Sequence, residues 1–505
     1  MPCKAACACL ALCLAATAAA ALAPPAPARL LAWLPFGRRS PGHLHSEAAE
    51  AHRVHSLPGW GKLSTRLYSG EVPISKDKAM FYALVEADCR HPEDAPVVLW
   101  LTGGPGCSSV GTAFIGEHGP FFPRPGSTSR LMQNPYSYHT LPANMLYLDA
   151  PVGVGFSYSN SSDDYKQLAT DKGMATDMVD FIREWRKLFP RLARAPFWLA
   201  GESYAGHYVP HITLQLLEHA GQAMNSGEER IDFKGFLLGN PSTDEEYDNE
   251  GRLTFWWSHG LISQNVKKAV EHHCNFSEVI ITQGIEVKTK TQNRKCEKAV
   301  QQALSEMGPI KMQNVFGDKC LDKRFTSATP PAPSWLARLL PARLARMLGS
   351  KHHPDPCITE EGEAYLARSD VQEALHANRS GALDWSYKGC TEGEVFKYSV
   401  DDQLDSMLPL YRRINKDAPH LRTLIYTGDA DGMVPLTGTR RWVLRLGTEE
   451  GKREKRHWTH WMDPNGQVGG YLEEYEDFTF VTVRRAGHEA PYTGEWAGRK
   501  LPDAR

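Results

Sequence analysis

The chain has 505 residues, of which 42% are hydrophobic and 23% are charged, so it has enough apolar content for a large buried core. A peptide hormone and a disordered tail are therefore excluded. Lys and Arg number 57 against 59 Asp and Glu, giving a formal net charge of −2, with no basic excess to bind nucleic acid and no acidic run typical of a disordered tail.

The first 23 residues have the features of a signal peptide. Lys4 precedes an Ala/Leu/Cys run over 5–23, and the closing Ala-Leu-Ala has the small-x-small form that signal peptidase cleaves. A membrane anchor is the alternative, although alanine is a weak membrane former and the run barely reaches the length of a span. We expect a secretory route to a vacuole, a lysosome or the outside, with no membrane contact after signal removal.

Candidate glycosylation sites fit that route. Asn-X-Ser/Thr triplets place them at Asn160, Asn275 and Asn378, although such triplets also arise by chance.

The 11 cysteines favour disulfides over a metal site. Four lie in the first 13 residues, and the other seven form no CxxC pair and no zinc-finger spacing, so no metal is expected. In an oxidising compartment, seven cysteines predict three disulfides and one free thiol. These seven are Cys89, Cys107, Cys274, Cys296, Cys320, Cys357 and Cys390.

Strand and helix patterns alternate along most of the chain. After a Pro/Ala/Arg-rich stretch to about residue 50, segments 63–67 and 79–86 are predicted to pair around Gly70 and Pro73. Residues 171–189 carry apolar side chains at spacings of three and four, which predicts an amphipathic helix. This alternation predicts an α/β fold with a mostly parallel sheet covered on both faces. Apolar runs predict core strands at 96–101, 144–149, 196–200, 233–238, 423–427 and 478–483.

The pattern breaks between about 254 and 395. This region holds five of the seven cysteines named above, two of the Asn-X-Ser/Thr triplets and no strong strand, and it predicts an inserted, mainly helical subdomain. A Pro-rich stretch and a Leu/Arg run near 326–353 predict an exposed linker that is a candidate for excision. The expected order is signal peptide 1–23, core 50–253, insert 254–395 and core 396–505.

A candidate nucleophile follows the predicted strand at 196–200. Residues 201–205 read Gly-Glu-Ser-Tyr-Ala and precede a helical pattern. This is a variant of the nucleophile elbow, in which a tight strand-to-helix turn exposes a serine hydroxyl at the carboxyl edge of the sheet. The motif alone is weak, and its strand-turn-helix context strengthens it. Ser203 is the candidate nucleophile.

A serine nucleophile needs a base, and the base needs an orienting carboxylate. The strand at 423–427 runs into a turn with Asp429 and Asp431, and the strand at 478–483 leads to His488. A single histidine among 20 is usually structural, but these turns follow strand ends in the order Ser, Asp, His of α/β hydrolases.

A glycine-rich turn at 102–109 follows the first core strand and can present backbone N–H groups to an oxyanion. The alternatives are a phosphate-binding loop or a simple tight turn. No Gly-Lys-Ser/Thr follows, so a P-loop is not supported.

Together these motifs resemble the serine carboxypeptidases, an α/β-hydrolase family of lysosomal, vacuolar and secreted exopeptidases. The resemblance runs from about residue 59 to 491 and rests on several long motifs in the right order. The matching segments are 98–109, 134–137, 151–159, 201–208, 428–436 and 486–491.

The resemblance implies site roles by position. It gives Ser203 as nucleophile, His488 as base and Asp431 as the orienting carboxylate, with Asp429 structural. The oxyanion donors would be the backbone N–H groups of Gly104 and Tyr204. No cofactor is implied.

The resemblance also implies a clamp for the substrate carboxylate, built from Thr102, the Gly103 backbone and a protonated Glu202, with Glu117 sharing the proton. Thr102 stands where the family usually has Asn, so we expect a looser clamp. The alternative for Glu202 is a helix cap. Only 17 residues follow His488, so the usual C-terminal helix after that motif is not expected.

By position, the family pattern pairs Cys107 with Cys390, Cys274 with Cys296 and Cys320 with Cys357. It leaves Cys89 as a free thiol.

The implied activity is release of C-terminal amino acids from peptides or proteins through an acyl-enzyme, favoured at acidic pH. Two alternatives stay open. One is acyl transfer from sugar esters, although relatives with that activity often carry Asp where this chain has Glu202. The other is a non-catalytic partner or chaperone role. A second copy of the chain, in a homodimer, is a further candidate partner.

Overall fold

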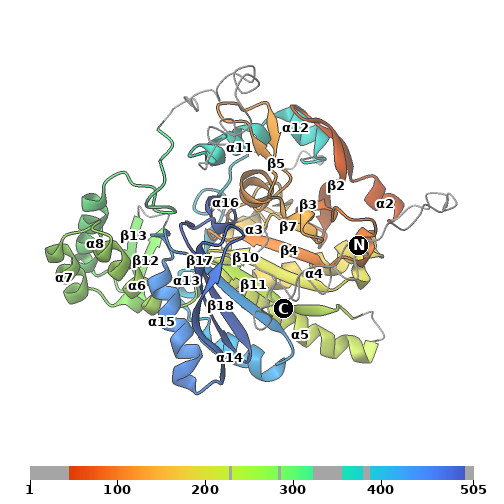
Figure 1. Cartoon of the computed structure of the whole chain (residues 1–505). Helices are drawn as coiled ribbons and strands as arrows, with labels where there is room; N and C mark the ends of the chain where they lie inside the picture. Colours follow the sequence, from red (N-terminus) through yellow and green to blue (C-terminus); the bar gives the residue numbers. More distant parts are fainter. Residues whose placement is uncertain (1–44, 227–229, 283–285, 322–354, 379–386, 495–505) are drawn as a thin grey trace.

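The computed structural model describes residues 45–226, 230–282, 286–321, 355–378 and 387–494 (Figure 1). The predicted signal peptide and the predicted linker near 326–353 lie outside these residues and stay predictions.

A 12-stranded mixed sheet runs through the molecule in the order β1-β2-β3-β7-β4-β10-β11-β15-β18-β17-β16, with β8 paired to β3. The central strands are parallel, and all six strands expected from continuous apolar runs are present. They are β4 (Val97–Thr102), β7 (Asn144–Leu148), β10 (Phe197–Glu202), β11 (Phe233–Gly239), β15 (Arg422–Gly428) and β18 (Phe478–Val483).

Antiparallel strands extend the sheet at both edges. At one edge lie β1 (Arg53–Leu57), β2 (Gly61–Pro73), β3 (Lys78–Val85) and β8 (Tyr158–Ser159). At the other lie β16 (Glu454–Met462) and β17 (Val468–Tyr475), which sequence analysis did not predict.

The predicted N-terminal hairpin forms, but its turn is not at Gly70 and Pro73. Both residues are paired within β2, opposite Tyr82 and Ala79, and the chain turns after them. A Cβ at Gly70 would lie 2.8 Å from the His52 ring, so a larger residue here would have to displace that side chain. Pro73 is the last residue of its strand, a position that needs no ladder N–H.

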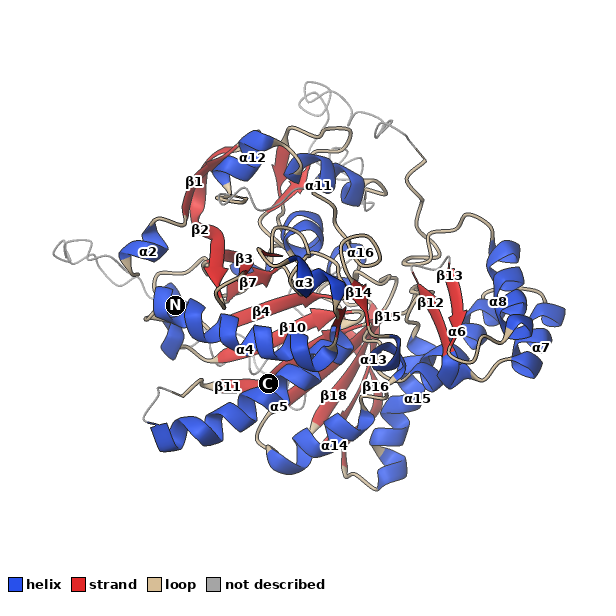
Figure 2. Cartoon of the chain, turned by 180° about the vertical axis from the view of Figure 1, so that it is seen from behind, coloured by secondary structure: helices blue, strands red, loops and turns tan. Residues whose placement is uncertain are grey.

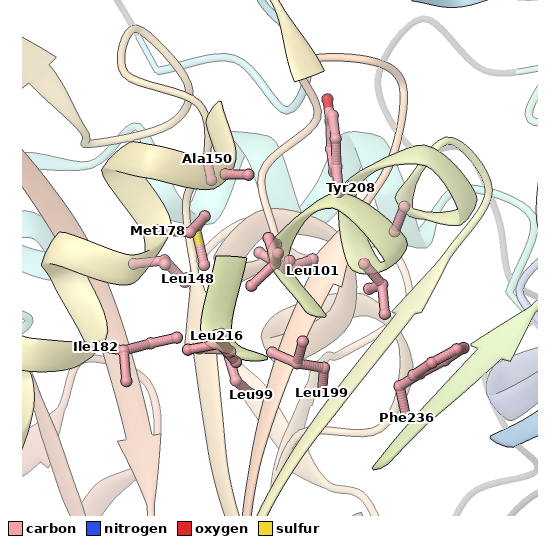
Figure 3. Close-up of a cluster of buried hydrophobic side chains, with 14 of the residues drawn as sticks. Leu99, Leu101, Leu148, Ala150, Met178, Ile182, Leu199, Tyr208, Leu216 and Phe236 are labelled. Carbon is pink, nitrogen blue, oxygen red and sulfur yellow. The ribbon is translucent and has the colours of Figure 1, made fainter. Parts of the chain in front are cut away.

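Helices cover both faces of the sheet because successive side chains of a strand point to opposite faces. Leu99 and Leu101 of β4 pack toward α4 (Asp171–Leu188), the helix predicted at 171–189, and α5 (Ala205–Ser226), as Figure 3 shows. The same face carries α14 (Leu408–Asp417) and α15 (Leu436–Leu446).

Val98 and Trp100 point to the opposite face, which is covered by the wide helix η2 (Val110–Glu117), α11 (Ile358–Leu366) and α12 (Ser369–Ala374). Within the described ranges, no helix is both long and apolar enough to cross a membrane.

The described part of residues 254–395 lies in two places. Helices α6 (Glu245–Ser258), α7 (Gln264–His273) and α8 (Arg294–Met307) enclose an apolar cluster of their own with the hairpin β12 (Val279–Thr282)–β13 (Glu286–Thr289). Helices α11 and α12 pack elsewhere, against η2 and β1 (Figures 1 and 2). The domain boundaries given above stay a prediction.

Short elements complete the described chain. They are α2 (Glu47–Glu50), α3 (Ser162–Lys166), α13 (Val400–Leu404), α16 (Ala490–Thr493), β5 (Phe121–Pro123), β6 (Leu131–Gln133), β9 (Leu168–Ala169), β14 (Lys397–Tyr398), η1 (Pro92–Asp94), η3 (Tyr138–Thr140), η4 (Leu192–Arg194), η5 (Phe276–Glu278) and η6 (Thr448–Glu450).

The three expected disulfides are confirmed. They are Cys107–Cys390, Cys274–Cys296 and Cys320–Cys357.

The expectation that Cys89 is a free thiol is wrong for this chain, because Cys89 is disulfide-bonded. The other six described cysteines pair with one another.

Candidate active site

Ser203 occupies a strained turn between β10 and α5. Its φ is 64°, in the left-handed region that non-glycine residues avoid at a cost of about 1–3 kcal/mol. The turn is held by the Ser203 N–H, which donates to the Gly239 carbonyl at 3.0 Å, and by the Ser203 carbonyl, which accepts from Ser242 N at 3.0 Å. A Cβ at Gly206 would lie 2.1 Å from the Ser242 carbonyl oxygen, so the motif needs a glycine there. This geometry is that of a nucleophile elbow.

Asp431 and His488 meet at the same edge of the sheet. His488 Nδ1 lies 2.7 Å from Oδ2 of the fully buried Asp431. Since an ionised carboxylate only accepts, Nδ1 carries the proton and leaves Nε2 as the basic nitrogen. Asp429 does not contact His488; its Oδ1 accepts from Arg485 N at 2.6 Å.

Asp431 is surrounded by donors. Besides His488, it accepts hydrogen bonds from Met433 N at 2.7 Å, Val434 N at 3.2 Å and Asn240 Nδ2 at 2.8 Å. These donors fix the orientation of the Asp431 side chain toward His488.

Asn240 is a site residue that sequence analysis missed. It follows β11 directly, is fully buried and has a φ of 40°. Its side chain also accepts from Gly428 N at 3.1 Å and so links Asp431 to the end of β15. A polar residue just past a predicted strand end was the available signal, and it is the signal that identified Asp431 and His488.

His488 is 8% exposed, and its pKa is raised to about 9. Burial by itself lowers this pKa, but the charge of Asp431, its hydrogen bond and the neighbouring Glu489 and Glu117 raise it by more. Protonation of Glu117 therefore lowers the pKa of His488.

No hydrogen bond joins Ser203 and His488 within the described chain. Such contacts are often looser before substrate binds.

The glycine-rich turn after β4 lies against the elbow. A Cβ at Gly103 would be 2.2 Å from Tyr204 N and 2.9 Å from Ser203 Cβ, so only glycine leaves room beside the nucleophile. Neither Gly104 N nor Tyr204 N donates to another atom of the described chain. Both N–H groups are thus available to a developing oxyanion.

Glu117 and Glu202 form a buried carboxyl pair next to Ser203. Each is 2% exposed, and both carboxyl oxygens of Glu117 and the Oε2 of Glu202 are buried without a hydrogen-bond partner in the described chain. Burial first, and then the charge of neighbouring Glu489, raises the pKa of Glu117 well above its usual range. Burial and the neighbouring Glu117 do the same to the pKa of Glu202. Two neighbouring buried carboxyl groups cannot both ionise without a large cost, so this pair favours keeping a proton.

Thr102 lies beside this pair. It stands opposite Glu202 in the parallel register of β4 and β10. It is 6% exposed, and its hydroxyl oxygen accepts from Trp100 Nε1 at 3.2 Å, so its own O–H remains to donate.

Glu489, which sequence analysis also missed, adds a third carboxyl. It follows His488, and its Oε2 is buried with no hydrogen-bond partner. Its position directly after the predicted base was the available signal.

Another buried carboxyl group, that of Asp149, holds the glycine-rich turn in place. It accepts from Ser108 Oγ at 2.6 Å and from Val110 N at 3.1 Å, and Tyr387 donates to the same serine at 2.9 Å. Burial raises the pKa of Asp149 to about 6 in spite of these bonds.

Within the described ranges, no group of three or more His, Cys, Asp or Glu side chains is arranged to hold a metal ion.

Comparisons with known proteins agree with this geometry. The family model described as "Serine carboxypeptidase" matches residues 58–498. Serine carboxypeptidase-like 34 of Arabidopsis thaliana is 36% identical over 456 residues, covering 88% of this chain and 86% of that protein. Serine carboxypeptidase 24 of the same plant is 35% identical over 476 residues, covering 92% of this chain and 95% of that protein.

A solved structure shares the fold. The prohormone-processing carboxypeptidase Kex1(delta)p of Saccharomyces cerevisiae superimposes with a TM-score of 0.67 at 21% identity, covering 90% of this chain and 94% of that chain.

Proposed function

The chain belongs to the serine carboxypeptidase family, and on that premise we propose that it releases C-terminal amino acids from peptides through an acyl-enzyme on Ser203. The observation that carries the proposal is the buried Glu117–Glu202 carboxyl pair beside the nucleophile elbow. An exopeptidase must recognise a terminal carboxylate, and a protonated carboxyl can do so as a hydrogen-bond donor.

The reaction follows from the residues at the sheet edge. Nε2 of His488 accepts the Ser203 proton while Oγ attacks the carbonyl carbon of the last peptide bond. The oxyanion accepts from the N–H groups of Gly104 and Tyr204, each worth roughly 10²–10³ in rate. The tetrahedral intermediate collapses, His488 protonates the departing amine, and the C-terminal amino acid leaves. Water then attacks the ester with His488 as base, and Ser203 recovers its proton.

The carboxyl pair explains how the terminal carboxylate is bound without a cation. Protonated Glu202 donates one hydrogen bond to it, and the Thr102 hydroxyl and the Gly103 N–H supply two more. If Glu202 were ionised, two negative groups would face each other in a site from which water is largely excluded. Glu202 therefore binds substrate only while it holds its proton.

Two protonation events oppose each other in the pH profile. Substrate binding weakens as pH rises, because the carboxyl pair loses its proton. Catalysis weakens as pH falls, because His488 must be neutral to act as base, and its pKa of about 9 in the empty site works against acidic activity. Protonation of Glu117 removes one cause of that high pKa. We propose a bell-shaped profile that favours acidic pH, where the clamp is intact.

The three confirmed disulfides support an oxidising, secretory compartment as the place of action. Asn160 and Asn275 are exposed and Asn378 is half-buried, so glycosylation of the first two is our stronger proposal.

One assay set tests the function. The purified protein is offered a blocked dipeptide, the same dipeptide amidated at its C-terminus, and a sugar ester with an acyl acceptor. We expect release of the terminal amino acid from the free acid and little turnover of the amide at acidic pH. Turnover of the sugar ester alone would replace the proposal with acyl transfer. No turnover of any substrate would favour a non-catalytic partner role.

A further inference from the structure

A short segment of the chain between α8 and Cys320 lies across both loops that carry the proposed acid and base. We call residues Met312–Val315 the strap. The Met312 carbonyl accepts from Gly432 N at 2.8 Å, and the Val315 N–H donates to the Ala430 carbonyl at 3.0 Å. The strap is therefore hydrogen-bonded to the residues immediately before and after Asp431 in the sequence.

The strap also holds the base directly. The Gln313 carbonyl accepts from the backbone N–H of His488 at 2.6 Å. One segment thus bonds to the neighbours of Asp431 and to His488 itself, although these two loops lie 57 residues apart in the sequence.

Glycines on both loops permit this close approach. A Cβ at Gly487 would lie 2.3 Å from the Gln313 carbonyl oxygen, and a Cβ at Gly432 would lie 2.9 Å from Val315 Cγ1. Any other residue at Gly487 would push the strap away from His488.

Anchors hold the strap and the loop beneath it. The strap leads through Gly317 to the Cys320–Cys357 disulfide, which fastens it to the start of α11. Helix α11 packs against η2, the helix that ends at Glu117. On the Asp431 loop, Trp256 Nε1 donates to the Gly432 carbonyl at 2.9 Å.

We infer that the strap is a positioning segment for the reaction: its backbone fixes the Asp431 loop relative to the His488 loop, and so keeps the His488 ring aligned toward Ser203. This inference rests on the proposed role of Ser203, Asp431 and His488. The strap touches neither Thr102 nor Glu202 through these bonds, so its loss should act on turnover rather than on substrate binding.

Loosening the strap should also change how kcat depends on pH. The charged or titratable groups that act on His488 are Asp431, Glu489 and Glu117, and Asp431 makes the largest contribution that raises its pKa. If Asp431 drifts from the ring, the pKa of His488 falls, and the acid limb of kcat moves to lower pH. A purely structural segment would lower stability without moving that limb.

The test is Val315→Pro, which deletes the N–H that bonds to Ala430. The matched control is Lys311→Pro, which places a proline one residue before the strap without removing any of the three bonds. Both are assayed on an activated ester with no free carboxylate, with the rate of Ser203 labelling by a phosphonate and the melting temperature measured alongside.

We expect Val315→Pro to lower kcat on the order of 10²-fold, to leave KM near the wild-type value and to move the acid limb to lower pH. Lys311→Pro should do none of these. A Val315→Pro variant with the kcat and acid limb of the control would overturn the inference. Hydrolysis of the ester needs the triad but not the carboxylate clamp. If the wild-type protein hydrolysed the ester but not peptides, the proposed function would be rejected, and the effect of the strap on the triad could still be measured.

If Val315→Pro does not fold, the two disulfides near the strap provide the second test. Cys320→Ser with Cys357→Ser removes the anchor of the strap, whereas Cys274→Ser with Cys296→Ser removes a bridge within the α7–α8 cluster. We expect only the first pair to lower kcat and move the acid limb, and the second to lower the melting temperature alone. Equal effects of the two pairs on kcat would overturn the inference.

Discussion

Two buried carboxyl groups of the site, Asp431 and Glu202, differ in the hydrogen-bond donors around them. Asp431 is fully buried but accepts four hydrogen bonds, from His488, Asn240, Met433 and Val434. This set of donors holds the side chain in the orientation that meets His488.

Glu202 is 2% exposed, its Oε2 has no hydrogen-bond partner in the described chain, and its neighbour is another carboxyl group, Glu117. A buried acid in that position retains its proton above its usual range. The difference teaches that burial alone does not decide the role of an acid: the donors around it do. One carboxyl orients a base, and the other donates to a substrate anion.

The substitution with the largest expected effect removes the Ser203 hydroxyl group, which both carboxyl groups serve. Ser203→Ala should lower peptidase turnover on the order of 10⁶-fold, the scale of losing a triad member. A serine-directed phosphonate should label wild type at Ser203 and leave the variant unlabelled, as peptide mapping would report. Labelling at Ser157 would contradict the assignment.

The next effect tests the charged carboxyl. Asp431→Asn keeps the shape of the side chain but no longer holds the His488 proton on Nδ1, so kcat should fall on the order of 10⁴-fold. Peptide and ester substrates should lose equally, because the tautomer matters to both. A loss confined to peptides would show that Asp431 acts on substrate binding instead.

A smaller effect tests the donors of Asp431. Asn240→Ala removes one hydrogen bond to a charged group, worth about 1.5–3 kcal/mol, which corresponds to roughly 10–100-fold in kcat if that energy is needed to orient His488. Asn249→Ala is the control, since Asn249 is also a buried asparagine but bonds within α6 and to the β12 region. Equal losses in the two variants would reject the role of Asn240.

The smallest expected effect concerns stability. Like Glu202, other buried acids of this chain have a raised pKa. Burial raises the pKa of Asp149 to about 6, of Asp248 to about 8 and of Glu361 to about 7. A carboxyl whose pKa is higher in the folded than in the unfolded chain contributes stability below its unfolded pKa of about 4, and that contribution is lost as pH rises through the folded value. The melting temperature should therefore fall between about pH 5 and pH 8.

The control for this effect is Asp248→Asn, whose amide stands in for the protonated acid and should flatten part of the decline. A protein that melts higher at pH 8 than at pH 5 would contradict this account.

The central fold and the triad could be predicted from sequence because their signals are local. Parallel strands buried on both faces are continuous apolar runs, as at Val97–Thr102, and the site residues lie in turns just past such runs. The edge strand Glu454–Met462 was missed because Lys455, Arg456 and His457 place charge on a half-exposed strand, where no apolar run forms.

Other features carry no local signal. The strap acts through backbone groups of Met312, Gln313 and Val315, which almost any residue would present, proline at position 315 excepted. Pairing of Glu117 with Glu202 came from family resemblance, since 85 residues separate them and only the packing of η2 against the central strands brings them together.

The central claim is that protonated Glu202 binds the substrate carboxylate, and its most direct test is kcat/KM against pH for wild type and Glu202→Gln on a peptide with a free C-terminus. The glutamine amide donates at every pH, so we expect wild-type activity to fall toward neutral pH while the variant, weaker at acidic pH, falls far less. A Glu202→Gln variant that declines toward neutral pH as steeply as wild type would contradict the claim.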